Sequence, residues 1–392
     1  MERGAGILSL DTFYRDSFVE VDLSAIQYNI HQLQQRLDEK TGVYAVVKAD
    51  AYGHGDIQVA HAALEAGAEG LAVALLDEAI KLRHAGIDAP ILVMGWTRPK
   101  DAVVAAEHEI AVTVFQEEWL KEAGLLSFSK SLKVHLKLDT GMGRIGVRSV
   151  AEMERILSYM KEENFFSLEA LFTHFATADE EGLDYFATQE KRWNELFSHF
   201  KRIWPENVEV HTSNSAASMR YPGRLDHYVR FGISMYGLYP SSVVKKERPI
   251  DLQPAFSLHS QLIHVKRLEP GESISYGATY RTGNHEWIGT IPLGYADGWI
   301  RRLQGMDVLV DGKRQPIVGR ICMDQFMIRL DQEYPIGTKV TLIGKQGEQE
   351  ISADEVADQL ETINYEIPCM ISNRVPRVFL KDGKTIDIKN SL

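Results

Sequence analysis

The sequence has little cysteine, no excess of basic charge and no long apolar run. Cys322 and Cys369 are the only cysteines in 392 residues, too few for a disulfide framework, so we expect a reducing, cytoplasmic setting. Neither belongs to a CxxC or Cys/His pattern with zinc spacing, which argues against a metal site. Lys and Arg total 43 against 55 Asp and Glu, a balance that disfavours binding to nucleic acid or anionic membranes. No apolar stretch could span a bilayer, and the opening MERGAGILSLDTFYRD lacks the apolar core of a signal peptide.

Length and composition instead indicate two folded domains. A chain of 392 residues exceeds the usual size of one domain. Its 44% apolar and 25% charged residues are typical of a globular protein with a full core. Disorder and low complexity are excluded on the same grounds.

The first part of the chain alternates short apolar strands with helical segments. Helices are expected at Asp56–Ala66 and Asp77–Ala85, with Asp77 as an N-cap and with Gly67 and Gly86 just past the C-terminal ends. Eight such units predict an α/β fold, a (β/α)₈ TIM barrel, over residues 14–242. An open doubly wound sheet is the alternative that the same alternation allows. The expected strands are Val43–Lys48, Gly70–Leu75, Ile91–Gly95, Ala111–Phe115, Lys133–Asp139, Leu168–His174, Val208–Thr212 and Tyr228–Ile233.

The pattern changes near Tyr239–Pro254, after which strands follow one another without long helices. Asp311-Gly312 is a hairpin signal, and one helix is expected at Ser352–Glu361. We therefore predict a mostly antiparallel β-domain over residues 243–392, with which the first few residues of the chain could also pack. Its expected strands are Ser257–Leu268, Trp287–Pro292, Met306–Val310, Pro316–Arg320, Met323–Leu330 and Lys339–Ile343.

Lys48 stands out because it ends the apolar strand VYAVVK. Active-site residues of TIM barrels lie at the C-terminal ends of the strands. Partial desolvation there lowers the pKa of an amine, and a neutral amine attacks aldehydes. Lys48 is thus a candidate for covalent attachment of an aldehyde cofactor. The alternative is a strand-end lysine whose ammonium reaches water.

The segment AVVKADAYGHG around Lys48 resembles the pyridoxal-phosphate lysine signature of the alanine racemases, which have a barrel followed by a β-domain. The similarity extends from about Tyr14 to about Arg377, leaving the first dozen residues outside it. It recurs in KLDTGMGRIG (Lys137–Gly146), LFTHFATAD (Leu171–Asp179), SNSAAS (Ser213–Ser218), VRFGISMYG (Val229–Gly237), SYGATY (Ser275–Tyr280), PLGYADGW (Pro292–Trp299), GRICMDQ (Gly319–Gln325) and NYEIPC (Asn364–Cys369).

This resemblance implies that the protein interconverts L-alanine and D-alanine with pyridoxal 5'-phosphate and supplies D-alanine for peptidoglycan. It assigns the two acid/base roles to Lys48 and Tyr276, on opposite faces of the substrate. It also places His174 near the tyrosine, and Arg230 beyond His174 at the ring nitrogen of the cofactor. From the residues alone, Tyr276 could cap a turn and His174 could be an ordinary strand-end histidine.

The resemblance further implies the residues that bind cofactor and substrate. Arg144 and the backbone of Met323 would hold the substrate carboxylate. Lys137 would be carbamylated, because two poorly solvated cations side by side repel each other. Tyr295 and Asp324 are supporting residues, and the tyrosines at 295 and 365 would narrow the site for alanine. The expected cofactor residues, besides those already named, are Tyr52, Asn214, Ser215, Gly232, Ile233 and Tyr365; from the residues alone, Ser215 could be a helix N-cap.

The second catalytic residue lies in the second domain, and in this family it reaches the site of a neighbouring subunit. The resemblance therefore implies a homodimer with shared active sites. Three other functions remain open at this point. They are a racemase of broader specificity that acts on serine, an amino-acid decarboxylase of related fold, and a non-catalytic protein that binds pyridoxal phosphate.

Overall fold

The computed structural model describes residues 13–223 and 227–391. Most of the N-terminal extension predicted to lie outside the family resemblance, residues 1–12, is therefore not described. The chain divides into two compact units. The barrel unit comprises Ala25–Ala51 and Asp56–Gln253, and the β-unit comprises the described residues up to Ser24, Tyr52–Gly55 and everything described from Pro254 onward.

The barrel unit is built on eight parallel strands in the order β8-β7-β6-β5-β4-β3-β2-β9. The outermost strands, β8 and β9, meet through backbone hydrogen bonds from His227 N to Val210 O, 2.8 Å, and from Arg230 N to Ser213 O, 3.0 Å. This closure confirms the predicted TIM barrel over the open doubly wound sheet. The strands are β2 (Gly42–Val46), β3 (Gly70–Val73), β4 (Ile91–Val93), β5 (Ala111–Val114), β6 (Leu132–Lys137), β7 (Phe166–Phe172), β8 (Glu209–His211) and β9 (Tyr228–Phe231).

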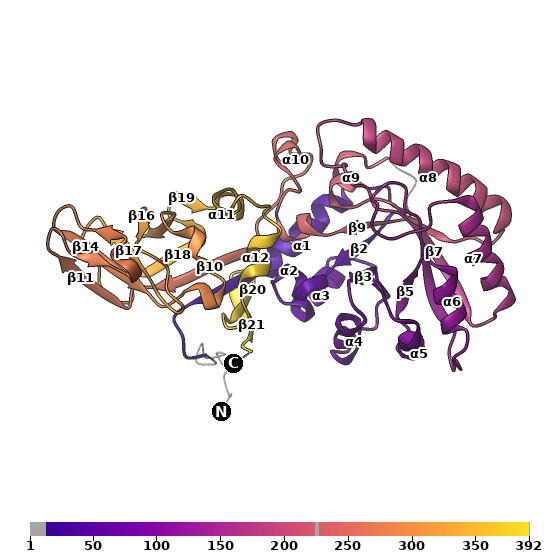
Figure 1. The fold of residues 1–392 in the computed structure, drawn as a ribbon, viewed down its shortest axis with the longest axis horizontal. Helices are drawn as coiled ribbons and strands as arrows, with labels where there is room; N and C mark the ends of the chain where they lie inside the picture. The colour runs from indigo at the N-terminus through magenta and orange to yellow at the C-terminus, as the bar shows by residue number, and fades with distance from the viewer. Residues whose placement is uncertain (1–12, 224–226, 392) are drawn as a thin grey trace, which may run out of the picture. The chain divides into compact units, whose positions relative to one another are not determined.

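Helices lie on the outside of these strands (Figure 1). The prediction of Asp77 as an N-cap is wrong. Helix α4 begins one residue earlier, and the Glu78 carboxylate accepts from the backbone N–H groups of Ala74 and Leu75, at 2.8 and 3.1 Å. Gly67 and Gly86 have positive φ, as a residue past a helix end requires. The helices are α1 (Leu23–Gln34), α3 (Asp56–Glu65), α4 (Leu76–His84), α5 (Ala102–Glu107), α6 (Glu117–Ala123), α7 (Val150–Glu162), α8 (Asp184–Ile203), α9 (Ser215–Arg220) and α10 (Ser242–Glu247), with a short turn α2 (Lys48–Tyr52).

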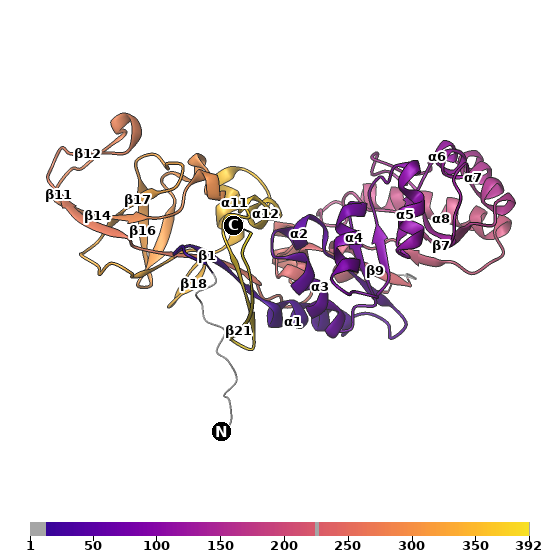
Figure 2. The same cartoon turned by 90° about the horizontal axis from the view of Figure 1, so that it is seen from below.

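The β-unit is one mixed sheet in the order β11-β14-β17-β16-β15-β18-β10-β1-β20-β21, with β19 on β18 and a separate pair β12-β13 (Figure 2). Among the described strands of this unit, β1 and β20 alone pair in parallel. The strands are β1 (Phe18–Asp22), β10 (Phe256–Gln261), β11 (His264–Leu268), β12 (Ser273–Ile274), β13 (Tyr280–Arg281), β14 (Glu286–Ile291), β15 (Asp307–Val310), β16 (Lys313–Val318), β17 (Phe326–Leu330), β18 (Lys339–Gln346), β19 (Gln349–Ile351), β20 (Arg377–Lys381) and β21 (Lys384–Lys389); the helices are α11 (Ala353–Leu360) and α12 (Glu366–Met370).

Local signals in this unit are confirmed with one exception. Asp311 and Gly312 both have positive φ and join β15 to β16, as the hairpin signal predicts. Ser352 caps α11 by accepting from Glu355 N at 3.1 Å. The single strand expected at Ser257–Leu268 is wrong. It is two strands, because β10 pairs with β1 and β18 whereas β11 pairs with β14.

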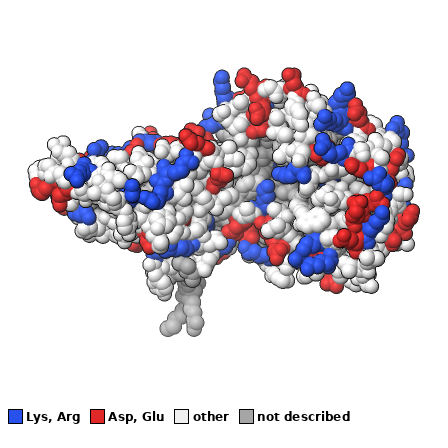
Figure 3. Space-filling view, viewed as in Figure 1, with Lys and Arg blue, Asp and Glu red and all other residues white. Residues whose placement is uncertain are grey.

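The structure also shows how charged and apolar side chains are distributed. Acidic and basic side chains are interspersed over the visible face of the barrel unit (Figure 3). Among the described helices, none has the length and apolar character needed to cross a membrane. Within residues 13–223 and 227–391, no group of three or more His, Cys, Asp or Glu side chains could hold a metal ion.

Candidate active site

Lys48 comes two residues after the end of strand β2, with Val47 between them, and is half-buried. The next four residues, Ala49–Tyr52, all have φ of 53° or 54°, the left-handed region. Each non-glycine residue there costs roughly 1–2 kcal/mol. The turn is held by hydrogen bonds from Ala49 N to Glu78 Oε1, 2.6 Å, and from Ala51 N to Val47 O, 3.0 Å. Strained backbone of this kind concentrates at functional sites, where the surrounding structure holds it in place.

Four cations converge near His174, which follows strand β7. Burial lowers the pKa of His174 far below its ordinary value, and the charges of Arg230, Lys137, Arg144 and Lys48 lower it further. Burial also lowers the pKa of Lys137 to about 7, with Arg144 and then Arg230 adding to the shift. The structure thus brings together five of the predicted residues. A neutral imidazole and a half-neutral amine lie among fixed positive charges, an environment suited to an anionic ligand.

Arg230, on strand β9, is 3% exposed and its guanidinium is enclosed by acceptors. It donates to the carbonyls of Thr173 and Thr212, at 2.8 and 3.2 Å, and to Nδ1 of His174 at 3.3 Å. It also donates to Nδ1 of His211 at 2.8 Å and to the His211 carbonyl. Arginine has no acceptor and does not lose its proton. Nδ1 of His211 must therefore be the unprotonated nitrogen of that ring.

This assignment propagates to a second buried histidine, His135 on strand β6. Nε2 of His211 carries the proton and donates to Nδ1 of His135 at 3.0 Å. The proton of His135 is then on Nε2, 4.0 Å from the Glu169 carboxylate. Burial lowers the pKa of His135 to about 3, with Arg230 the next contributor, and it also lowers the pKa of His211. Both rings stay neutral, and the hydrogen bonds run in one direction, from Arg230 to His211 and from His211 to His135.

The sequence reasoning missed His135 and His211. A usable signal was present, because polar residues in short parallel strands that are otherwise apolar must find partners inside the barrel. Phe172 on β7 was missed for the opposite reason, since an apolar residue there looks like ordinary core. Its ring stacks on His211 with centroids 4.6 Å apart and lies 5.4 Å from both the Lys137 amine and the Arg230 guanidinium.

The residues predicted to bind phosphate in the barrel unit lie together after strands β8 and β9. The N-cap of α9 is Asn214, whose side chain accepts from Ala217 N at 3.0 Å. Ser215 is therefore not the cap, and its hydroxyl accepts from Gly232 N at 2.9 Å. Ser234, next to Ile233, is fully buried, and its hydroxyl has no hydrogen-bond partner within the described part of the chain. Such an unsatisfied buried hydroxyl is expected beside a binding site for a polar group.

Arg144 lies in a loop that a single carboxylate organises. Oδ1 of Asp139 accepts from the N–H groups of Gly141 and Gly143, at 3.0 and 2.9 Å. Gly146, with φ of 140°, passes so close to Asp139 that a side chain would collide with its backbone. Arg144 is exposed and lines an open pocket of about 470 Å³ with Phe115, Gln116, Glu117, Glu118, Ile145, Gly146, Arg148, Glu152, Arg155 and Ile156.

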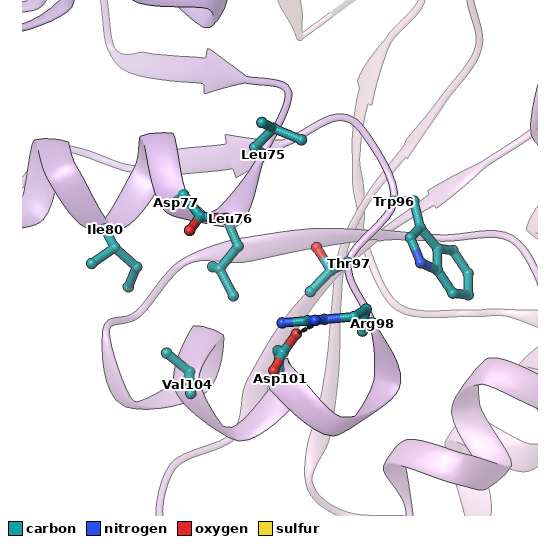
Figure 4. Close-up of a pocket in the computed structure, with 9 residues that line it drawn as sticks. All are labelled: Leu75, Leu76, Asp77, Ile80, Trp96, Thr97, Arg98, Asp101 and Val104. Carbon is teal, nitrogen blue, oxygen red and sulfur yellow. Dashed lines mark hydrogen bonds and ion pairs between the residues drawn. The ribbon is translucent and has the colours of Figure 1, made fainter.

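Another pocket of the barrel unit contains none of the predicted residues. It lies after strands β3 and β4 and is drawn in Figure 4. Arg98 and Asp101, which both line it, form an ion pair with 2.5 Å between Nε and Oδ2. The lining residues are Leu75, Leu76, Asp77, Ile80, Trp96, Thr97, Arg98, Asp101 and Val104.

The β-unit brings the predicted residues of the second domain together at its surface. Tyr276 is 70% exposed and Met323 53% exposed. The Ser275 hydroxyl donates to Arg320 O at 2.5 Å, which links the segment that contains Tyr276 to the segment that contains Met323. Tyr295 N donates to Cys322 O at 3.1 Å, and Asp324 accepts from Arg374 at 3.0 Å.

Tyr52 and Tyr365 also belong to the β-unit, with ring centroids 6.3 Å apart. Burial raises the pKa of the Tyr52 phenol. The predicted residues therefore form one group around Lys48 in the barrel unit and further groups in the β-unit.

Comparison with known proteins identifies the family. Residues 21–240 match the model of the alanine racemase N-terminal domain, and residues 255–379 that of the C-terminal domain. Alanine racemase from Geobacillus stearothermophilus is 56% identical over 98% of both chains, and alanine racemase 1 from Bacillus subtilis is 51% identical over 98% of both. The crystal structure of alanine racemase from Bacillus anthracis with bound L-Ala-P superposes with a TM-score of 0.94, at 52% identity over 96% of this chain and 98% of that one. A histidine racemase from Leuconostoc mesenteroides also matches, with a TM-score of 0.87 and 32% identity over 94% and 98% of the two chains. The chain therefore belongs to the alanine racemase family of isomerases.

Proposed function

We propose that this protein is a pyridoxal-phosphate-dependent enzyme that interconverts L- and D-alanine by transferring the Cα proton between two bases. The observation that carries the proposal is the group of four basic side chains, Arg230, Lys137, Arg144 and Lys48, that adds to the effect of burial in lowering the pKa of His174 and so keeps this histidine neutral. When bound through Lys48, pyridoxal phosphate supplies the electron sink that makes the Cα proton of an amino acid removable.

The residues of the barrel unit fit this cofactor on three counts. Lys48 offers an amine at the end of a barrel strand for the aldehyde. Ser215, Gly232 and Ile233 offer a hydroxyl and backbone N–H groups for the phosphate, beside the unsatisfied hydroxyl of Ser234. Arg230 offers a guanidinium that can only donate, which leaves a pyridine nitrogen unprotonated. With the cofactor bound, such a contact would weaken the electron sink, which would favour return of the proton to Cα over side reactions. Asn214, Tyr52 and Tyr365 complete the proposed cofactor residues.

Lys48 and Tyr276 are the two bases in this proposal. An ordinary phenol titrates near ~10, too high for an efficient base at neutral pH. Tyr276 therefore needs a hydrogen-bonding or cationic neighbour, and its exposure in a single chain leaves it available to one. We propose that Tyr276 of the partner subunit approaches His174, so that each site of a homodimer uses two chains.

Arg144 binds the substrate carboxylate, with the backbone of Met323 opposite it. The neutral form of the Lys137 amine adds carbon dioxide and loses a proton, which gives a carbamate anion that can pair with Arg144. The lowered pKa of Lys137 supports this assignment. Tyr295 and Asp324 act as supporting residues. The bacterial relatives are consistent with supply of D-alanine for peptidoglycan, and the two free cysteines support a cytoplasmic location.

Subunit mixing tests the two-base, two-chain arrangement. Lys48→Ala and Tyr276→Phe homodimers should each be nearly inactive with L-alanine. Mixed in equal amounts and allowed to exchange, they should recover about a quarter of wild-type activity, since about half of the dimers are mixed and each of these has one intact site. No recovery after verified exchange would refute shared sites.

A substrate panel separates the remaining functions. The similarity to a histidine racemase makes this panel necessary, since the same fold takes a larger side chain there. We expect rapid loss of optical activity with L-alanine and slower loss with serine, because one methylene or hydroxyl changes specificity by only about 1–3 kcal/mol. Carbon dioxide released from lysine or ornithine would instead show a decarboxylase. Cofactor binding without reaction would show a carrier protein.

A further inference from the structure

One face of helix α8 contacts two loops of the site, the loop after β6 that carries Arg144 and the segment after β7 that carries His174. Tyr185, Gln189 and Arg192 are spaced four and three residues apart, so they lie on the same side of the helix. All three donate hydrogen bonds to the Thr140–Gly141 segment, which begins the Arg144 loop. We call these three side chains the α8 clamp.

Gln189 is the centre of the clamp because it touches both loops. Its side chain is fully buried, its Oε1 accepts from Ala176 N at 2.8 Å, and its Nε2 donates to His174 O at 3.1 Å and to Thr140 Oγ1 at 3.3 Å. One amide thus links the segment after β7 to the segment after β6. A hydrogen bond of 2.8 Å between the hydroxyls of Thr140 and Thr173 adds a second link.

The outer members of the clamp hold only the Arg144 loop. The Tyr185 hydroxyl donates to Gly141 O at 2.6 Å, and Arg192 donates to Thr140 O at 3.3 Å. Gly141 has φ of 146°, and a side chain there would come within 2.9 Å of the Tyr185 hydroxyl and 3.1 Å of Gln189 Cγ. The close approach therefore requires glycine at 141 and fixes where the loop leaves the barrel.

We propose that Gln189 and Tyr185 are positioning residues for the substrate carboxylate, because they hold the loop of Arg144 at a fixed place relative to His174. This inference deepens the proposed function and rests on it. The clamp acts through backbone atoms, so no part of it needs to touch the substrate. A burial role alone would be satisfied by an apolar side chain of the same size, whereas a positioning role requires the hydrogen bonds.

Two substitutions remove hydrogen bonds while keeping volume. Tyr185→Phe deletes one hydroxyl at a residue that is 44% exposed, so the fold should tolerate it. Gln189→Met deletes all three polar contacts of the buried amide. Lys191→Met is the matched control, since it places the same side chain at an exposed position of the same helix.

Three measurements on the holoenzyme test the proposal. The first is amide hydrogen exchange of the 138–147 segment. The second is the dissociation constant of propionate, which has the carboxylate of alanine without its amine. The third is the visible absorbance of the cofactor as a function of pH. We expect both variants to exchange faster in that segment and to bind propionate about 2- to 10-fold more weakly, the usual effect of one lost hydrogen bond.

The third measurement distinguishes the two variants. Gln189→Met should also change the pH dependence of the absorbance, because it releases the His174 segment beside Arg230. Tyr185→Phe should leave the absorbance as in the wild type. Lys191→Met should match the wild type throughout.

Wild-type affinity for propionate in both variants would overturn the proposal, even with faster exchange. If Gln189→Met does not fold, Tyr185→Phe alone decides the question. A wild-type protein that neither binds the cofactor nor racemises alanine would overturn the proposed function itself. An active wild type with unaffected variants would overturn the clamp alone.

Discussion

Arg230 donates a hydrogen bond of 2.8 Å to Nδ1 of His211, and this single contact fixes the protonation of two buried rings. Because the guanidinium cannot accept, His211 must donate through Nε2 to His135. Arg230 thus donates to neutral carbonyl and imidazole groups. The charge of Arg230 lowers the pKa of His174, in addition to the effect of burial, and is available to a bound ligand.

Replacing His211 should be costly even when an aromatic ring is kept at this position. His211→Phe removes one of the acceptors of Arg230 and leaves Nδ1 of His135 unpaired, and each loss costs about 1–3 kcal/mol when the group is buried. We expect a lower free energy of unfolding and weaker cofactor binding. Urea denaturation and cofactor titration measure the two effects. His61→Phe, on the exposed side of α3, is the control and should be neutral.

The buried histidines should make the protein sensitive to acid. The folded pKa of His135 is about 3 against an ordinary 6.5, so between these values the unfolded chain binds a proton that the folded chain does not. Stability therefore falls as pH decreases through this window, by up to about 1.4 kcal/mol per pH unit for each such histidine. His135→Phe should reduce the slope of unfolding free energy against pH by about one proton. An unchanged slope between pH 6 and pH 4 would contradict the assignment.

Carbamylation of Lys137 should depend on pH. Only the neutral amine reacts with carbon dioxide, and a pKa of about 7 makes half of it neutral at that pH. With ¹³C-bicarbonate, we expect a carbamate signal that grows as pH rises through about 7. Arg144→Gln should move this onset to higher pH, because the charge of Arg144 lowers the pKa of Lys137 more than any other charge does. A bare amine at every pH would rule the modification out.

The left-handed turn after Lys48 should tolerate glycine unusually well. Ala49 is exposed and has φ of 54°, so Ala49→Gly removes backbone strain of roughly 1–2 kcal/mol against an entropic cost of about 0.4–1 kcal/mol. We expect stability to be unchanged or higher by thermal denaturation. Ala187→Gly, at an exposed position inside α8, should instead lose about 1 kcal/mol. Equal losses at both positions would show that the turn is not strained.

Shared active sites predict that Met323 becomes protected when subunits associate. It is 53% exposed in one chain. Hydroxyl-radical labelling of Met323 should decrease as protein concentration rises, whereas labelling of Tyr14, which is fully exposed, should stay constant. Labelling that does not depend on concentration, in a protein shown to dimerise, would place Met323 outside the interface.

The strands and the candidate lysine could be predicted because their signals are local. A mainly apolar run of five to seven residues bounded by turn residues predicts a buried strand wherever it lies, and all eight barrel strands overlap their predicted ranges. The two failures have the same origin. The start of α4 and the division of Ser257–Leu268 depend on which distant groups supply hydrogen bonds, and the sequence pattern does not contain this information.

The barrel, the β-rich second half and the place of Lys48 near a strand end follow from local patterns, since period and turn chemistry act over a few residues. The environment of the site depends instead on how the chain folds. His135 and His211 are 76 residues apart in the chain yet share a proton, and Gln189 hydrogen-bonds to Ala176 and Thr140, which lie 13 and 49 residues before it. Burial and charge depend on these distant neighbours, so the lowered pKa of Lys137 and the neutral state of His174 appear only when the strands are closed into a barrel.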